Sequence, residues 1–172
     1  DGPWTELFST LGSTSAGWER DAACTFVGSS FRNMTAGDLA RIGLLMQRDG
    51  RWGEQQLLPK AWVDFNRTPF ANYQPQADKP NASVPGGQWW LNAAVAGAPK
   101  PWPDAPSNML VASGHWGQGL YVLPDEKLVI VRYADDRDDS FDRNHLLKLV
   151  LSALVQEVLP STVFDLLAAY LC

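Results

Sequence analysis

Residues 112–123 read ASGHWGQGLYVL and join a glycine-rich segment to a run of strong β-formers. The turn sequence PDEK follows at 124–127, and the chain returns through the β-branched run LVIVRY at 128–133. Apolar runs of this length, bounded by turn residues, are typical of buried strands. The sequence therefore predicts a β-hairpin over 121–133, with a polar, glycine-lined segment at its start.

The segment before this hairpin is the strongest candidate for a functional site. It contains His115, one of only two histidines in the chain, and glycines at 114, 117 and 119. Glycine leaves room for another backbone or a ligand to approach closely. We therefore expect any functional site of this chain to include the segment.

Two helices are predicted earlier in the chain. Thr35 is a good N-cap, and Asp38 three residues later gives a capping-box pattern. Apolar residues follow at helical spacing until Asp49-Gly50, which predicts a helix over 36–48. Pro59 suits the first turn of a second helix, expected over 60–66.

The remaining segments complete an α+β pattern. Proline-rich loops are expected over 67–86 and 95–107, and strands over 87–92 and 109–111. An apolar helix is expected from 146 to 158, and a short final helix from 161 to about 171. The fold class is therefore α+β, with an antiparallel sheet covered by helices. Residues 1–86 would form a helical and loop part, and residues 87–172 the strands and C-terminal helices.

Composition excludes several classes of protein. The net charge of −5 argues against a nucleic-acid partner, and no apolar run approaches the roughly 20 residues of a membrane span. Cys24 and Cys172 fit no metal-site spacing, and they can be paired or free. Because Cys172 is the last residue of the chain, where ends usually fray, we favour free thiols. We expect neither a metal nor an organic cofactor.

Several segments, taken in order, resemble the serine β-lactamase-like hydrolases. This group includes class C β-lactamases, related esterases and the 6-aminohexanoate-oligomer hydrolases. The similar segments are MTAGDLARIGLL at 34–45, DGRW at 49–52, LLPKAWV at 57–63, QWW at 88–90 and GHWGQ at 114–118. The resemblance extends from about residue 20 to residue 158. It implies the C-terminal part of a β-lactamase/transpeptidase-like fold.

Two motifs of that family are missing. The family carries Ser-x-x-Lys, which supplies the nucleophile and its base, and Tyr-x-Asn, and neither occurs in these 172 residues. In the family both precede the segments matched here, and this chain begins at Asp1 without a methionine. The resemblance therefore implies a C-terminal portion that is inactive alone. Its expected partners are an ester or amide substrate and the N-terminal half of the same hydrolase, or a second chain.

The resemblance also implies roles within the segment 114–118. His115-Trp116-Gly117 matches the third catalytic motif of the family, whose first position is lysine or histidine. The residue after the glycine donates its N–H to the oxyanion, which assigns that donor to Gln118. Catalytic roles are thus expected for His115, Gly117 and Gln118. Trp116, with Trp89 and Trp90, is expected to contact the substrate. The bulk of the Trp116 indole favours an ester, peptide or other amide over a β-lactam as the substrate.

Other interpretations of the same residues compete with this one. The eight tryptophans are mostly expected in the core. Alternatively, the chain is a non-catalytic module that binds glycan or peptide along a face formed by Trp89, Trp90, Trp102 and Trp116. A local triad of His115, Asp38 and one of the serines at 29, 30 or 113 has no support, because Asp38 is already explained as a helix cap. His145, the other histidine, is expected to be an ordinary surface or capping residue. The compartment is not determined, although the resemblance favours a periplasmic or secreted protein.

Overall fold

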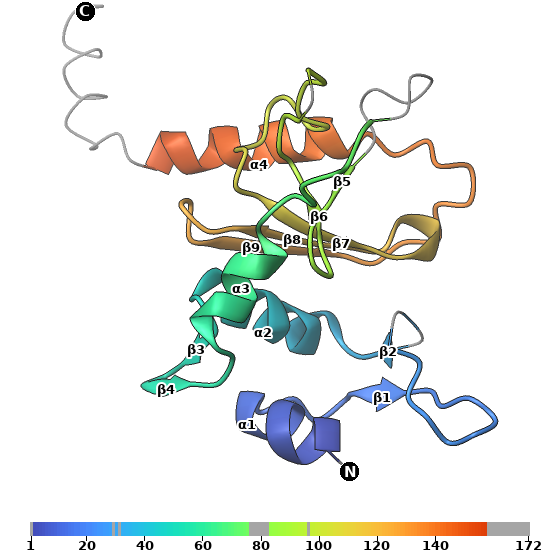
Figure 1. Ribbon diagram of the computed structural model, residues 1–172. Coiled ribbons are helices and arrows are strands. Elements are labelled where there is room, and N and C mark those ends of the chain that lie inside the picture. The colour runs from blue at the N-terminus through green and yellow to red at the C-terminus, as the bar shows by residue number, and fades with distance from the viewer. Residues whose placement is uncertain (1, 29, 31, 76–82, 96, 158–172) are drawn as a thin grey trace, which may run out of the picture.

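An antiparallel sheet of five strands forms the centre of the computed structural model (Figure 1). The structure describes every residue except 1, 29, 31, 76–82, 96 and 158–172. The strands lie in the order of the chain, each antiparallel to the next: β5 (Val84–Pro85), β6 (Trp90–Leu91), β7 (Leu110–Ser113), β8 (Gly119–Leu123) and β9 (Leu128–Arg132). The α+β class with an antiparallel sheet is confirmed.

Helices cover both faces of this sheet. Helices α2 (Ala36–Gln47) and α3 (Lys60–Asn66) lie on one side, and α4 (Arg143–Glu157) lies on the other (Figure 1). Successive side chains of a strand point to opposite faces. Leu120 and Val122 of β8 accordingly pack on the α2 side, whereas Tyr121 and Leu123 pack on the α4 side. Burial on both faces explains why this strand is a continuous apolar run.

Most of the predicted elements agree with the structure in type, and several differ in their limits. Helix α3 has the expected bounds, and α2 ends one residue early. Helix α4 begins before residue 146, because Asp142 accepts a hydrogen bond from the backbone N–H of His145 at 2.9 Å and caps its first turn. Strand β6 is shorter than expected, and β5 lies inside the segment expected to be a loop. The expected final helix and Cys172 lie outside the described residues, and Cys24 is free and exposed.

Smaller elements surround this core. The chain begins with a helical turn, η1 (Trp4–Phe8), that continues into α1 (Ser9–Leu11). Strands β1 (Gly17–Trp18) and β2 (Arg32–Asn33) pair with each other, and β3 (Arg51–Trp52) pairs with β4 (Gln55–Gln56) between the two helices. The pairing of β1 with β2 brings the N-terminal segment to the start of α2.

The N-terminus of α2 is capped in a different way from the predicted capping box. Thr35 Oγ1 accepts from the Asp38 N–H at 3.3 Å, as expected. In a capping box the Asp38 carboxylate would also accept a hydrogen bond from the Thr35 N–H. Here Ser15 Oγ accepts from that N–H, at 2.9 Å. Instead, the buried carboxylate accepts from the N–H and hydroxyl of Ser15, from the N–H of Thr14 and from Arg41. Asp38 therefore ties the N-terminal segment to the helix.

This arrangement predicts a loss of stability in acid. Hydrogen bonds from Ser15, together with the charge of Arg41, hold the pKa of the Asp38 carboxyl below its ordinary value. Because the pKa is lower in the folded chain, this stabilisation is present above the unfolded pKa of about 3.9 and is lost as pH falls below it. In urea denaturation between pH 2 and pH 7, Asp38→Asn should show a smaller acid-dependent fall in midpoint than the wild type. Asp64→Asn, which alters an exposed pair with Lys60, should retain the wild-type fall. Equal pH dependence in wild type and Asp38→Asn would contradict the assignment.

Candidate functional site

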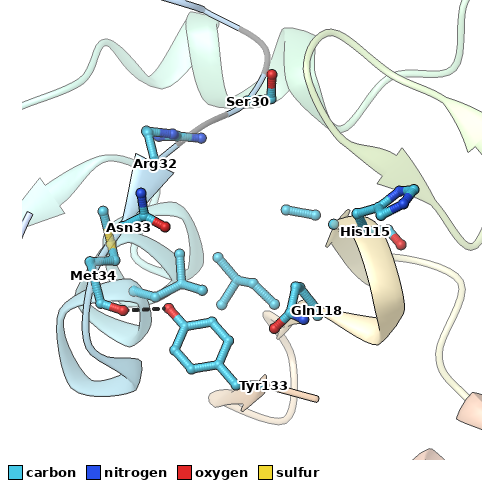
Figure 2. A pocket seen from close by; sticks show the side chains of 13 residues that line it. Ser30, Arg32, Asn33, Met34, His115, Gln118 and Tyr133 are labelled. Carbon is cyan, nitrogen blue, oxygen red and sulfur yellow. Dashed lines mark hydrogen bonds between the residues drawn. The ribbon is translucent and has the colours of Figure 1, made fainter. Parts of the chain in front are cut away.

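A cleft of about 730 Å³ lies beside the segment that connects β7 to β8 (Figure 2). This segment supplies one wall, and the chain around β2 supplies the opposite wall. The lining consists of Ala112, Ser113, Gly114, His115, Gln118 and Gly119 on the first side, Ser30, Arg32, Asn33 and Met34 on the second, and Leu39, Leu120 and Tyr133 between them. Residues far apart in sequence thus meet at the predicted motif.

The connection between β7 and β8 is a tight turn with an unusual backbone. The Gly114 N–H donates to the Gln118 carbonyl at 2.9 Å, which closes the turn around η2 (His115–Gly117). Trp116 has φ 55° and Gly117 has φ 85°, so two consecutive residues are left-handed. Glycine adopts this conformation freely, whereas a tryptophan does so at an energetic cost. Such strain often marks a functional turn.

Residues that follow β9 hold this turn in place. The Asp136 N–H donates to the Trp116 carbonyl at 3.0 Å, and the Arg137 guanidinium lies 4.3 Å from the centroid of the Trp116 ring. The Gln118 side chain donates to the Ala134 carbonyl and accepts from the Ala134 N–H. Residues 134–137 therefore hold the turn in place through hydrogen bonds and a ring contact.

The backbone N–H of Gln118 remains as an available donor. No hydrogen bond from it is made within the part of the chain that the structure describes. Gln118 is extended, with φ −64° and ψ 134°, and lines the cleft. An available amide at a cleft can bind an anionic or carbonyl oxygen.

Arg32, on the opposite wall, is the only lining residue with a formal charge. This charge is positive, although the chain as a whole is acidic. Figure 2 shows the Arg32 side chain extending into the cleft from the wall that faces His115. Its guanidinium lies over the Trp18 ring, 5.1 Å from the centroid, and partial desolvation by the surrounding chain lowers the pKa of Arg32 from its usual value, although the residue stays exposed to solvent. No carboxylate pairs with it among the described residues. The cleft thus presents a cation that can bind an anion.

Tyr133 fixes the base of the cleft. Its hydroxyl donates to the Met34 carbonyl at 2.9 Å, which joins the chain after β9 to the chain before α2 (Figure 2). Partial desolvation, together with the nearby Asp38 charge, raises the pKa of the Tyr133 hydroxyl above its ordinary value. The side chain is therefore a neutral donor engaged in holding the two walls together.

Comparisons with known proteins identify solved structures with a similar architecture. The chain matches no protein-family profile and no curated protein. It superimposes with a TM-score of 0.61 on a structure assigned as a 6-aminohexanoate-dimer hydrolase from Bacillus anthracis, which is 23% identical. It also superimposes with a TM-score of 0.52 on one assigned as a β-lactamase from Bacteroides dorei DSM 17855, which is 14% identical.

This chain has part of a β-lactamase-like fold. The matches cover 92% and 90% of the chain but only 37% and 49% of the two structures. The chain therefore spans less than half the length of either neighbour, and at these identities the likeness establishes the fold. The fold implied by the resemblance in the sequence is confirmed.

Within this β-lactamase-like fold, the predicted site residues are only partly brought together. His115 and Gln118 line the cleft, whereas Gly117 is buried within the turn and does not line it. The imidazole of His115 is exposed, and its ring centroid lies 4.9 Å from that of Trp116. The catalytic roles of these residues stay predictions.

The predicted tryptophan contacts lie outside the lining of this cleft. Trp116 turns to solvent against Arg137, Trp89 packs against the core on the α2 side, and Trp90 is exposed on β6. Trp102 is buried on the α4 side, so it cannot line a ligand groove. Only Trp102 of the eight tryptophans is buried, and those at positions 62, 90 and 116 are more than 40% exposed, which corrects the expectation that they mostly belong to the core.

The local triad is not assembled. Ser113 Oγ accepts from Arg143 at 3.1 Å, and Asp38 is committed to Ser15 and Arg41. Ser30 and His115 lie on opposite walls of the cleft (Figure 2), and Ser29 lies outside the described residues.

No group of His, Cys, Asp and Glu side chains among the described residues is arranged to hold a metal ion. No helix in that part of the chain is long and apolar enough to cross a membrane.

Proposed function

We propose that this chain is the C-terminal part of a β-lactamase-like serine hydrolase that cleaves an ester or amide through an acyl-enzyme. The observation that carries the proposal is the available N–H of Gln118 at a cleft beside His115. The turn that presents this amide is the one that resembles the family's third motif. The nucleophilic serine, its lysine and the tyrosine motif belong to a part outside these residues.

The Gln118 amide suits the chemistry of acyl transfer. Attack on a carbonyl produces a tetrahedral intermediate with a negative oxygen, and one preorganised N–H donor lowers the barrier by about 3 kcal/mol. Gly117 precedes this amide and supplies the left-handed backbone of the turn that presents it. The exposed imidazole of His115 is expected to interact with groups of the nucleophile-bearing part.

The charge of the cleft favours a substrate with a carboxylate. Arg32 faces the motif and has no carboxylate partner among the described residues. The structural neighbour from B. anthracis is assigned as a hydrolase of the 6-aminohexanoate dimer. Such a dimer is a linear amide with a carboxylate at one end. We therefore propose acyl substrates of this general class, with the carboxylate directed to Arg32.

An acylation assay tests the proposal. The assembled protein, which combines this chain with a nucleophile-bearing part, should release nitrophenol in a stoichiometric burst from a nitrophenyl ester. The chain of 172 residues alone should give no burst, because Ser-x-x-Lys is absent. A burst from the chain alone, or none from the assembled protein, would overturn the proposal.

Two esters test the predicted carboxylate preference. Mono-nitrophenyl glutarate should acylate the assembled protein faster than nitrophenyl acetate, and Arg32→Met should reduce that preference by about tenfold. Arg20→Met serves as the control, because Arg20 stacks on Phe26 at 4.2 Å and does not line the cleft. An unchanged preference in Arg32→Met would exclude Arg32 as the carboxylate site.

A further inference from the structure

The Arg132 side chain lies behind the turn that carries Gln118. Its Nη1 donates to the Gly117 carbonyl at 2.7 Å. That carbonyl and the Gln118 N–H belong to the same peptide group, and the described backbone contains no cis peptide bond. In a trans peptide the N–H points away from the carbonyl. A guanidinium that fixes the carbonyl therefore also fixes the direction of the Gln118 N–H, which is away from Arg132.

Arg132 is itself held firmly. It is the last residue of β9, and its side chain is 20% exposed. Asp136 Oδ2 lies 3.9 Å from Arg132 Nη2, and the Phe141 ring centroid lies 3.6 Å from Arg132 Cζ. The guanidinium is thus enclosed by a carboxylate, an aromatic face and the Gly117 carbonyl, and it does not line the cleft.

Gly117 makes this contact possible. A Cβ at residue 117 would collide with Arg132 Nη1 and would lie 2.9 Å from Asp136 Cβ. Two features therefore require a glycine at residue 117. One is the left-handed backbone, and the other is the lack of space for a Cβ beside the Arg132 guanidinium.

We propose that Arg132 is a positioning residue that orients and polarises the peptide group whose N–H stabilises the oxyanion. The inference rests on the proposed function. A cation at the carbonyl oxygen draws electron density from the peptide and strengthens the donor at its other end. A fixed donor also needs no reorganisation when charge develops on the substrate.

Kinetics of the assembled protein test the catalytic consequence. Arg132→Met should lower kcat for acylation by about 10- to 100-fold with little change in KM, because the interaction matters most in the transition state. Arg132→Lys, which retains the charge and one donor direction, should recover part of the loss. Arg67→Met is a matched control, because Arg67 is 23% exposed, pairs with Asp49 and donates to the Met46 carbonyl away from the cleft. Its kcat should stay within about twofold of wild type.

An NMR measurement on the chain itself separates this inference from the proposed function. In Arg132→Met the Gln118 amide proton should shift upfield, because the peptide loses its polarising partner. In Arg67→Met that resonance should stay in place, and well-dispersed spectra will show that both variants are folded. An unmoved Gln118 resonance in Arg132→Met overturns the inference whatever the activity. A moved resonance with an unchanged kcat overturns its catalytic consequence. If the wild-type assembly forms no acyl-enzyme, the proposed function fails, whereas a moved resonance still supports positioning of the amide by Arg132.

Discussion

Gly43→Leu is expected to destabilise the chain by about 3 kcal/mol or more, a large share of the stability of an ordinary domain. Gly43 lies in α2 where the helix packs against β8 and β9. A Cβ there would lie 2.6 Å from Val129 Cγ1 and 2.8 Å from Leu120 Cδ1, both closer than carbon atoms normally approach. The longer leucine side chain would force the helix away from the sheet.

Urea denaturation monitored by circular dichroism measures this effect. Gly37→Leu is the matched control, because Gly37 lies in the same helix and a Cβ there meets nothing within 4 Å. It should be neutral or stabilising by up to about 1 kcal/mol, since glycine is a poor helix former. Similar midpoints for the two variants would show that α2 does not depend on close approach at Gly43.

The elements predicted well are those with strong local signals. The run 119–132 and the helices at 36–47 and 60–66 each combine periodic or continuous apolar residues with caps and turns in one short window. Strands β5 and β6 have only two residues each and take their conformation from pairing with a neighbour. No pattern of spacing within such a short segment can indicate that pairing.

The candidate site was predictable on one wall only. His115 and Gln118 stand in a recognisable motif, whereas Arg32 and Tyr133 have no local signal that relates them to it. Arg32 reaches the cleft because β2 pairs with β1, and Tyr133 because it continues from β9. The role of Arg132 could not be inferred either, since its contact with Gly117 spans 15 residues.

Asp38 shows how a correct local interpretation can be incomplete. Its position three residues after Thr35 predicted a helix cap, and its N–H indeed bonds to Thr35. Its carboxylate instead bonds to Ser15, 23 residues earlier. Because this partner comes from tertiary structure, the sequence could indicate the helix start but not the link to the N-terminal segment.

Gly117→Ala is expected to have the largest effect on the candidate site. The variant combines a left-handed backbone, which costs a residue with a Cβ about 1–2 kcal/mol, with a collision against Arg132. Relief of that collision requires movement of the guanidinium or of the Gly117–Gln118 peptide, and either movement disturbs the Gln118 N–H, which is the proposed oxyanion donor. Acylation by the assembled protein should therefore fall by about 100-fold or more.

Gly53→Ala isolates the backbone contribution to this result. Gly53 has φ 58°, and a Cβ there meets nothing within 4 Å, so this variant carries the backbone strain without a collision. It should lose about 1–2 kcal/mol of stability in urea denaturation while acylation stays close to wild type. Gly117→Ala should lose more stability than Gly53→Ala as well as activity. If Gly117→Ala acylates at the wild-type rate, the amide that follows this glycine is not the oxyanion donor, because a displaced donor cannot preserve the rate.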